Sequence, residues 1–309
     1  MEINKKRYND IDSFFKRKFN KKMVKLPIDG GFSCPNRDGK ISKKGCIYCS
    51  IYGSGDFTYH NNRNIKEQLN YQKNLLSKKN REEFYIAYFQ NFTNTYADKN
   101  YLKRIYNEVL NIEFINGISI ATRADCLNDD VLEILNELNK KTFLFVELGL
   151  QSVNDKTIKF INRGYNQKTF DEGISKLIDL NIKTVVHLIV GLPNENKKDF
   201  LNDIFYVNEK NIWGIKIHNL YIQEETPLFL YYKKNPFNIM EKNEYIQNVI
   251  EMLEFLKPNI TIHRLTGDGP KEKIIEPKRS KNKASVLSTI DKILKEKNIR
   301  QGDKYIKPN

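Results

Sequence analysis

Residues 142–151, TFLFVELGLQ, form an apolar run of strand length with a glutamate in its middle. Five further apolar runs of similar length lie at residues 24–28, 84–90, 117–122, 183–190 and 214–220. Between them, residues 65–76, 101–110, 131–138, 170–180 and 200–207 show helical periodicity, and Asn128 is a candidate N-cap of the third stretch. Strands that alternate with helices predict a parallel α/β sheet.

Polar residues inside these runs favour a barrel over a flat sheet. A flat sheet covered by helices on both faces would bury them at a cost of about 1 to 3 kcal/mol for each unpaired group, whereas an open barrel lumen can hydrate them. We therefore expect chemistry at the C-terminal ends of the strands, where GLQS, VGLP and NLYIQ fall. Two-residue alternation places these polar residues on shared faces: Glu147 and Gln151 with Gly149, His187 with Ile189, and Lys216 with His218.

The chain is expected to have three parts: a basic N-terminal segment (1–23), a barrel (24–235) with a cysteine loop (30–58), and a helical, basic C-terminal extension (236–309). Within the extension we expect helices at 241–256 and near 286–294, and a seventh apolar run at 260–265. The two glycines of TGDGP (266–270) permit close backbone approach to a ligand.

Charge and hydropathy narrow the class of protein. The 309 residues, 39% of them hydrophobic, suffice for a large core, and no apolar run approaches 18 residues. The start MEINKKRYND has no apolar signal region, so we expect a cytoplasmic protein without a membrane segment. The net charge of +14 is concentrated at the ends, with nine basic and three acidic residues in 1–25 and twelve and five in 271–309. This distribution predicts a nucleic acid partner, although a Lys- and Asn-rich composition can also reflect genome base bias.

Three of the four cysteines lie in one loop, GGFSCPNRDGKISKKGCIYCS (30–50): Cys34, Cys46 and Cys49. Disulfides are not expected in the cytosol, and packing does not require three thiols in a Gly- and Lys-rich loop, so we predict a soft metal centre. A zinc ion completed by His60 and a four-iron cluster with one open iron both fit this pattern. Cys126 is separate, and we expect a small buried residue there, with a substrate-contacting role left open.

These residues resemble the radical S-adenosylmethionine (radical SAM) enzymes. The resemblance covers roughly residues 5–300. The eleven-residue gap between Cys34 and Cys46 is similar to the YhcC-type branch, and GSGDF and TGDGP are similar to its MnmL (YtqA-like) subgroup. Besides CPNRDG and GCIYC, the motifs that carry it, in order, are AYFQNFTNTYA, GISIATRADCL, VELGLQS, INRGY, HLIVGLP, GIKIHNLY and HRLTGDGP.

The resemblance implies a partial (β/α)6 TIM-like radical SAM barrel with a C-terminal helical, basic extension. It implies an enzyme with a 4Fe-4S cluster on Cys34, Cys46 and Cys49 and S-adenosyl-L-methionine on the fourth iron. The implied reaction converts wobble 5-carboxymethylaminomethyl-(2-thio)uridine of tRNA to 5-aminomethyl-(2-thio)uridine through a 5′-deoxyadenosyl radical. The implied partners are the anticodon region of tRNA and an electron donor such as a flavodoxin or ferredoxin. Alternatives are a radical SAM enzyme for a protein or small metabolite, and a non-enzymatic zinc-stapled RNA-binding protein.

The resemblance also implies roles for single residues. Arg123, Lys216 and His218 are inward-facing cations that would orient a carboxymethyl group, although Lys216 can equally pair with Glu147. The S-adenosylmethionine contacts that it implies are backbone groups of Gln90 and Asn91 for the amine, Gln151 and Arg163 for ribose and carboxylate, His187 for ribose, and Gly191 for adenine.

Overall fold

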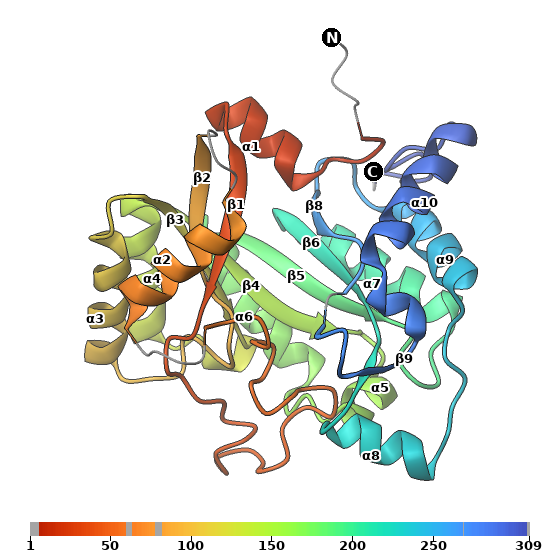
Figure 1. Ribbon diagram of the computed structural model, residues 1–309, viewed down its shortest axis with the longest axis horizontal. Helices are drawn as coiled ribbons and strands as arrows, with labels where there is room; N and C mark the ends of the chain where they lie inside the picture. Colours follow the sequence, from red (N-terminus) through yellow and green to blue (C-terminus); the bar gives the residue numbers. More distant parts are fainter. Residues whose placement is uncertain (1–5, 60–63, 78–81, 268, 308–309) are drawn as a thin grey trace. The chain divides into compact units, whose positions relative to one another are not determined.

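The computed structural model describes residues 6–59, 64–77, 82–267 and 269–307, so His60 and Asp268 lie outside the described residues (Figure 1). The chain divides into two compact units. We call Phe15–Gly149 with Asn162–Val185 the cysteine unit, and Met1–Phe14, Leu150–Ile161 and Val186–Asn309 the terminal unit. Each is described by itself.

The cysteine unit is built on parallel strands in the order β1-β2-β3-β4. In its register Lys25 lies opposite Ile86, and Tyr88 lies opposite Ser119. Helix α3 packs against α2 and α4 (Figure 1). The elements of this unit are β1 (Lys22–Ile28), α2 (Ile65–Leu76), β2 (Glu83–Phe89), α3 (Lys99–Leu110), β3 (Ile115–Thr122), the short helix η1 (Ala124–Cys126), α4 (Asp129–Lys141), α6 (Gln167–Asp179), and most of β4 (Phe143–Gln151).

The helices of this unit begin where capping chemistry predicts. Asn64 caps α2 by accepting from the N–H of Glu67, and the predicted cap Asn128 accepts from the N–H of Val131 to begin α4. One stripe of α4 is buried, which explains the helical periodicity of the sequence. Its buried residues are Val131, Ile134, Leu135 and Leu138.

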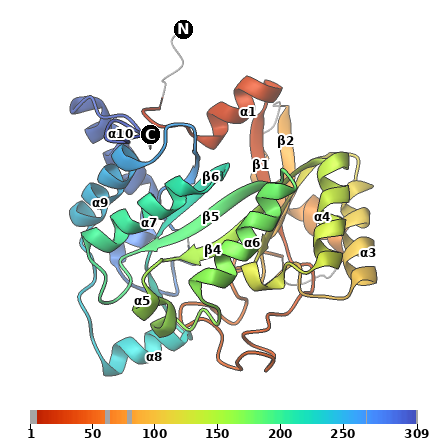
Figure 2. The same ribbon diagram turned by 180° about the vertical axis from the view of Figure 1, so that it is seen from behind.

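The terminal unit carries the strand order β5-β6-β8, with β6 and β8 parallel, and a separate antiparallel pair, β7 with β9. Helix α9 contacts both α7 and α10 (Figure 2). Its elements are α5 (Asp155–Phe160), α7 (Lys197–Glu209), β6 (Gly214–Asn219), β7 (Ile222–Gln223), α8 (Pro227–Lys234), α9 (Lys242–Phe255), β8 (Thr261–Arg264), β9 (Ile274–Glu276), the short helix η2 (Lys278–Lys281) and α10 (Lys283–Glu296). Helix α1 (Ile11–Phe19) and strand β5 (Lys183–Val190) have residues in both units.

The predicted α/β fold with a parallel sheet is confirmed, since all seven apolar runs form strands of one seven-stranded sheet. The run at 260–265 forms β8, so the expected C-terminal extension contributes a strand to that sheet. The sequence did not predict α1, α5, α8 or the β7–β9 pair. None of the described helices is long and apolar enough to cross a membrane.

The glycines of TGDGP meet side chains of this chain. A Cβ on Gly269 would lie 2.9 Å from the ring of Tyr221, and one on Gly267 would lie 3.0 Å from Oδ1 of Asn219. The buried Asn219 accepts from the hydroxyl of Thr266 at 2.8 Å and the N–H of Gly267 at 2.6 Å. The backbone at these two glycines therefore does make close contacts, and its neighbours are Tyr221 and Asn219 of the same chain.

Candidate cofactor site

The cysteine loop follows β1 and is held by its own backbone. The carbonyl of Cys34 accepts from the N–H groups of Arg37 at 2.8 Å and Asp38 at 3.1 Å, and the N–H of Cys49 donates to the carbonyl of Cys46 at 3.1 Å. All three thiols are free and half-buried, and those of Cys46 and Cys49 share a hydrogen bond. Two sulfur atoms of the predicted ligand set are therefore neighbours.

The surroundings of Cys46 favour a thiolate. Its pKa is lowered to about 6, chiefly by the hydrogen bond with Cys49 and also by the positive charge of Arg123, against the opposing effect of burial. The same shared proton, together with burial, raises the pKa of Cys49. Since the thiolate is the form that binds metal, Cys46 is prepared for ligation at neutral pH.

The donor set fits a thiolate-held iron–sulfur centre in its chemistry. Three free thiols come from one loop, two of them touch, and the charge of Arg123 is felt at Cys46, which offsets the negative charge that thiolates bring. Within the described ranges, no three His, Cys, Asp or Glu side chains are arranged to hold a metal ion as they stand. The zinc alternative involves His60, outside those ranges, and stays a prediction.

Two arginines share an aromatic neighbour beside this loop. The guanidinium carbons of Arg163 and Arg123 lie 4.4 and 4.8 Å from the ring centroid of Tyr165. Arg163 is 1% exposed, and its Nε donates to the carbonyl of Tyr165 at 3.1 Å. Nη1 of Arg123 donates to the carbonyl of Arg163 at 2.8 Å. The predicted carboxylate ligand Arg163 is thus held in a defined place, and Tyr165 is a site neighbour that sequence reasoning missed.

Arg123, expected to face the substrate, is engaged by its own chain. Its Nε and Nη2 donate to the two carboxylate oxygens of Asp125, at 2.9 and 2.8 Å. With Nη1 on the Arg163 carbonyl, all three nitrogens of the guanidinium form hydrogen bonds within the protein. The geometry favours a positioning role for Arg123.

Gln90 and Asn91 follow β2 and pack against the GSGDF segment. Asn91 is fully buried and donates to Oδ2 of Asp29 at 3.1 Å, while Gln90 donates to the carbonyl of Ser54. A Cβ on Gly55 would lie 1.9 Å from Oδ1 of Asn91, so this position requires glycine. The side chains are engaged in the protein, and backbone contacts to a methionyl amine stay a prediction.

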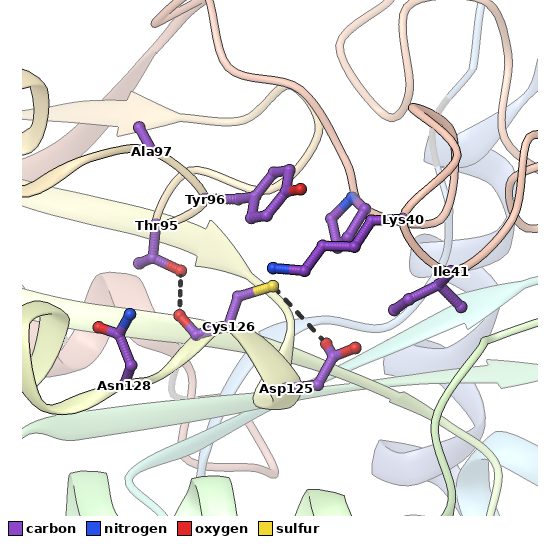
Figure 3. A pocket seen from close by; sticks show the side chains of 9 residues that line it. Lys40, Ile41, Thr95, Tyr96, Ala97, Asp125, Cys126 and Asn128 are labelled. Atoms are coloured by element: carbon purple, nitrogen blue, oxygen red, sulfur yellow. Dashed lines mark hydrogen bonds between the residues drawn. The ribbon is translucent and has the colours of Figure 1, made fainter.

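A cavity of about 400 Å³ adjoins the cysteine loop at Pro35, Lys40 and Ile41. Figure 3 shows the sulfur of Cys126 and the amine of Lys40 pointing toward each other in it. Cys126 is half-buried, so the expectation of a buried residue was wrong: it lies after β3, where the cavity leaves its thiol partly accessible. Burial nonetheless raises the pKa of this thiol to about 12, which keeps it neutral.

Glu147 has partners within the cysteine unit. Its carboxylate forms an ion pair with Lys25 and accepts from the hydroxyls of Ser119 at 3.1 Å and Tyr88 at 2.9 Å. The four side chains come from four neighbouring strands, one each from β1, β2, β3 and β4. Lys25 is a cation that the sequence analysis did not consider for Glu147.

The other predicted residues lie in the terminal unit. The rings of His187 and His218 are 5.3 Å apart between centroids, and Lys216 is buried on the strand that carries His218. Gln151 has a left-handed φ of +63° at the end of β4. Gly191 has φ +93°, and a Cβ there would meet nothing closer than 3.8 Å. The structure therefore gathers Cys46, Cys49, Arg123 and Arg163 in one unit, and His187 with His218 in the other.

Comparison with known proteins gives consistent matches. The model of the Radical SAM superfamily matches residues 37–207, and the Radical_SAM C-terminal domain model matches residues 212–296. The uncharacterized protein YtqA of Bacillus subtilis (strain 168) is 41% identical over 297 residues, covering 96% of this chain and 92% of that protein. Protein YhcC of Escherichia coli (strain K12) is 33% identical over 285 residues, covering 92% and 91%.

Two more distant proteins are also similar. A tRNA-2-methylthio-N(6)-dimethylallyladenosine synthase of Buchnera aphidicola subsp. Cinara cedri is 27% identical over 179 residues, covering 54% of this chain and 40% of that protein. The solved structure of Elp3 from the archaeon Methanocaldococcus infernus, with an N-terminus deletion, has a TM-score of 0.66 at 16% identity and covers 90% of this chain and 64% of that one. This similarity shows the fold, and the predicted fold class is confirmed.

Proposed function

Because the chain belongs to the radical SAM superfamily, whose enzymes use a 4Fe-4S cluster and S-adenosyl-L-methionine, we propose that it is the radical SAM enzyme that acts on the wobble uridine of tRNA. The proposed reaction converts 5-carboxymethylaminomethyl-(2-thio)uridine to 5-aminomethyl-(2-thio)uridine. The observation that carries the radical chemistry is the match to the Radical SAM superfamily over residues 37–207, together with the three free thiols of one loop.

The proposed cofactor contacts begin with the cysteine loop. Cys34, Cys46 and Cys49 would hold the cluster, and the guanidinium of Arg163 would bind the carboxylate of S-adenosylmethionine. When bound, the two cofactors would supply the radical chemistry needed to remove hydrogen from the substrate carbon between nitrogen and carboxylate. The remaining proposed contacts are backbone groups of Gln90 and Asn91, the side chains of Gln151 and His187, and the backbone at Gly191.

Two basic side chains of strand β6 suit a substrate with a carboxylate. Lys216 and His218, on strand β6, are proposed to orient the carboxymethyl group. Arg123 is proposed to act through Arg163, whose carbonyl it holds at 2.8 Å. A fixed cation directs the carboxylate without moving during the reaction.

Charge and relatives support tRNA as the substrate. The net charge is +14, and the last turn of α1 carries three basic residues, Lys16, Arg17 and Lys18, whose side chains are exposed. Such a surface suits phosphate contacts. The Buchnera relative is named for a reaction on tRNA, and the anticodon region and an electron donor such as a flavodoxin or ferredoxin are the proposed partners.

Nucleoside analysis tests this proposal. A strain that lacks the gene should accumulate 5-carboxymethylaminomethyl-(2-thio)uridine in its tRNA and lose the 5-aminomethyl form. Complementation with the wild type should restore the product, and complementation with Cys46→Ala should not. Unchanged nucleosides in the deletion strain would refute tRNA as the substrate, and anaerobic 5′-deoxyadenosine formation by the purified protein would then separate the chemistry from the substrate.

A further inference from the structure

Asn36 lies in the cysteine loop, two residues after Cys34, and is fully buried. Its Nδ2 donates to the carbonyl of Asn162 at 2.6 Å. The same nitrogen lies 3.6 Å from Sγ of Cys46 and 3.5 Å from the carbonyl of Arg163. An amide nitrogen carries two hydrogens, which suffices for the short contact to Asn162 and for a second acceptor such as the Cys46 sulfur.

Asn162 in turn holds the cysteine loop through Gly45. Nδ2 of Asn162 donates to the carbonyl of Gly45 at 2.6 Å, and the N–H of Gly45 donates to the carbonyl of Asn36 at 2.7 Å. Gly45 directly precedes Cys46. Two asparagines 126 residues apart therefore close a ring of hydrogen bonds around the start of the Cys46–Cys49 turn.

The local backbone leaves little freedom around this ring. Gly45 and Asn162 have left-handed φ values of +70° and +53°, and a Cβ on Gly164 would lie 2.9 Å from Oδ1 of Asn36. Arg123 holds the carbonyl of Arg163 from a second direction. Asn36 is thus enclosed by fixed backbone, which favours a single orientation for its amide.

We propose that Asn36 is a positioning residue that fixes Cys46 against the Asn162–Arg163 segment and donates an N–H···S hydrogen bond to the Cys46 sulfur. The inference rests on the proposed function, in that Cys46 is a cluster ligand there. Neither the family match nor the sequence motifs assign a role to this side chain.

Two consequences follow from this geometry. A donor to a coordinating sulfur stabilises the additional negative charge of the reduced cluster, so it raises the reduction potential. Because the same amide holds the backbone of Arg163, it also fixes the guanidinium that is proposed to bind S-adenosylmethionine. Loss of Asn36 should therefore change both a potential and an affinity.

Asn36→Asp tests the donor, because it keeps the size of the side chain and replaces the N–H groups with oxygen. The matched control is Asn162→Gly, which accepts the positive φ, keeps the carbonyl that Asn36 contacts, and removes only the amide that holds Gly45. Asn36→Ala serves as a second variant without added charge. Thermal unfolding of each protein shows whether it is folded.

The measurements are iron content and the midpoint potential of the anaerobically reconstituted cluster without S-adenosylmethionine, followed by S-adenosylmethionine affinity. Asn36→Asp and Asn36→Ala should shift the reduction equilibrium toward the oxidised cluster by at least tenfold, about 59 mV for one electron, and weaken S-adenosylmethionine binding about tenfold. Asn162→Gly should load less iron yet keep the wild-type potential. Folded Asn36 variants that cannot retain iron, beside an Asn162→Gly protein that still retains part of it, would also support the positioning role.

The opposite results are distinguishable. If both Asn36 variants load fully and match the wild type in potential and affinity, the inference is wrong and the proposed function stands. If the wild type itself forms no four-iron cluster, the proposed function is wrong and Cys46 has no cluster for Asn36 to position.

Discussion

The guanidinium of Arg123 and the carboxylate of Asp125 form a two-pronged ion pair, with N–O distances of 2.9 and 2.8 Å. Their side chains are only 10% and 15% exposed. The third nitrogen of Arg123 reaches the carbonyl of Arg163. Asp125 therefore sets the orientation of an arginine that in turn holds the INRGY segment, and this chain of contacts explains why a cation predicted to face substrate is better placed to organise its neighbours.

Asp125→Ala should lower the free energy of unfolding by about 3 kcal/mol, because it leaves a nearly buried guanidinium without its counter-charge. Urea unfolding measures the loss. Glu108→Ala is the control, since its ion pair with Arg104 is a 4.0 Å surface contact worth about 0.3 kcal/mol. Equal losses in the two variants would contradict a structural role for the Arg123–Asp125 pair.

Cys46→Ala should abolish both iron binding and 5′-deoxyadenosine formation, because it removes a proposed cluster ligand next to Cys49. Cys126→Ala is the matched control: it removes a half-buried thiol that lies outside the loop and whose pKa is raised to about 12. This variant should keep about four irons per chain. Iron and sulfide analysis after anaerobic reconstitution checks both, and a Cys126→Ala protein without iron would show that the ligand set is misassigned.

Regular elements were predictable wherever burial repeats along the sequence. The strand runs are apolar and buried over most of their length, the α4 stripe follows a period of 3.6 residues, and Asn128 marks a helix start by its chemistry. Helix α1 was not predicted, because its sequence, IDSFFKRKF, lies in a strongly basic segment that was interpreted only by its charge. Its buried residue Phe15 packs on Phe84 and Phe143 from two strands, contacts that no local pattern reveals.

In the candidate site, too, local sequence patterns were predictable and long-range contacts were not. The cysteine spacing is a local signal, whereas Asn36 and Asn162 are meaningful only as a pair. A signal was available in retrospect: each asparagine lies near a glycine with positive φ, Gly45 or Gly164, and both motifs belong to the resemblance. No role was predicted for Asp125, because its partner Arg123 was assigned to the substrate.

Stability should depend on pH through Glu195. Burial, with a smaller contribution from the charge of Asp199, raises the pKa of Glu195 to about 7, although it accepts a hydrogen bond from Ser152. An unfolded glutamate titrates near 4.3. Between these values the folded chain holds a proton that the unfolded chain has released, so the free energy of unfolding should fall as pH rises from about 4.5 to 7.

Glu195→Gln removes this titration, and its stability should fall less than that of the wild type over the same pH window. Urea unfolding at several pH values gives the two slopes, and their difference measures Glu195 together with its effect on Asp203, whose pKa is raised by burial and by the charge of Glu195. Glu172→Gln, at an exposed position of α6, should keep the wild-type slope. Identical slopes for the wild type and Glu195→Gln would contradict the raised pKa.

Gln151 and Asn194 allow a matched test of backbone strain against function. Both have a left-handed φ, +63° and +66°, and only Gln151 is proposed to contact S-adenosylmethionine. A non-glycine residue with a left-handed φ costs roughly 1 kcal/mol of folding free energy, so glycine should be tolerated at either position. Neither variant should change the free energy of unfolding by more than about 1 kcal/mol.

Gln151→Gly should nevertheless weaken S-adenosylmethionine binding by about tenfold, the size of one lost hydrogen bond, while Asn194→Gly should bind it as the wild type does. Calorimetric titration of the cluster-loaded proteins measures this difference. Equal affinities would mean that the unusual backbone at Gln151 serves the chain turn at the end of β4 and not the cofactor.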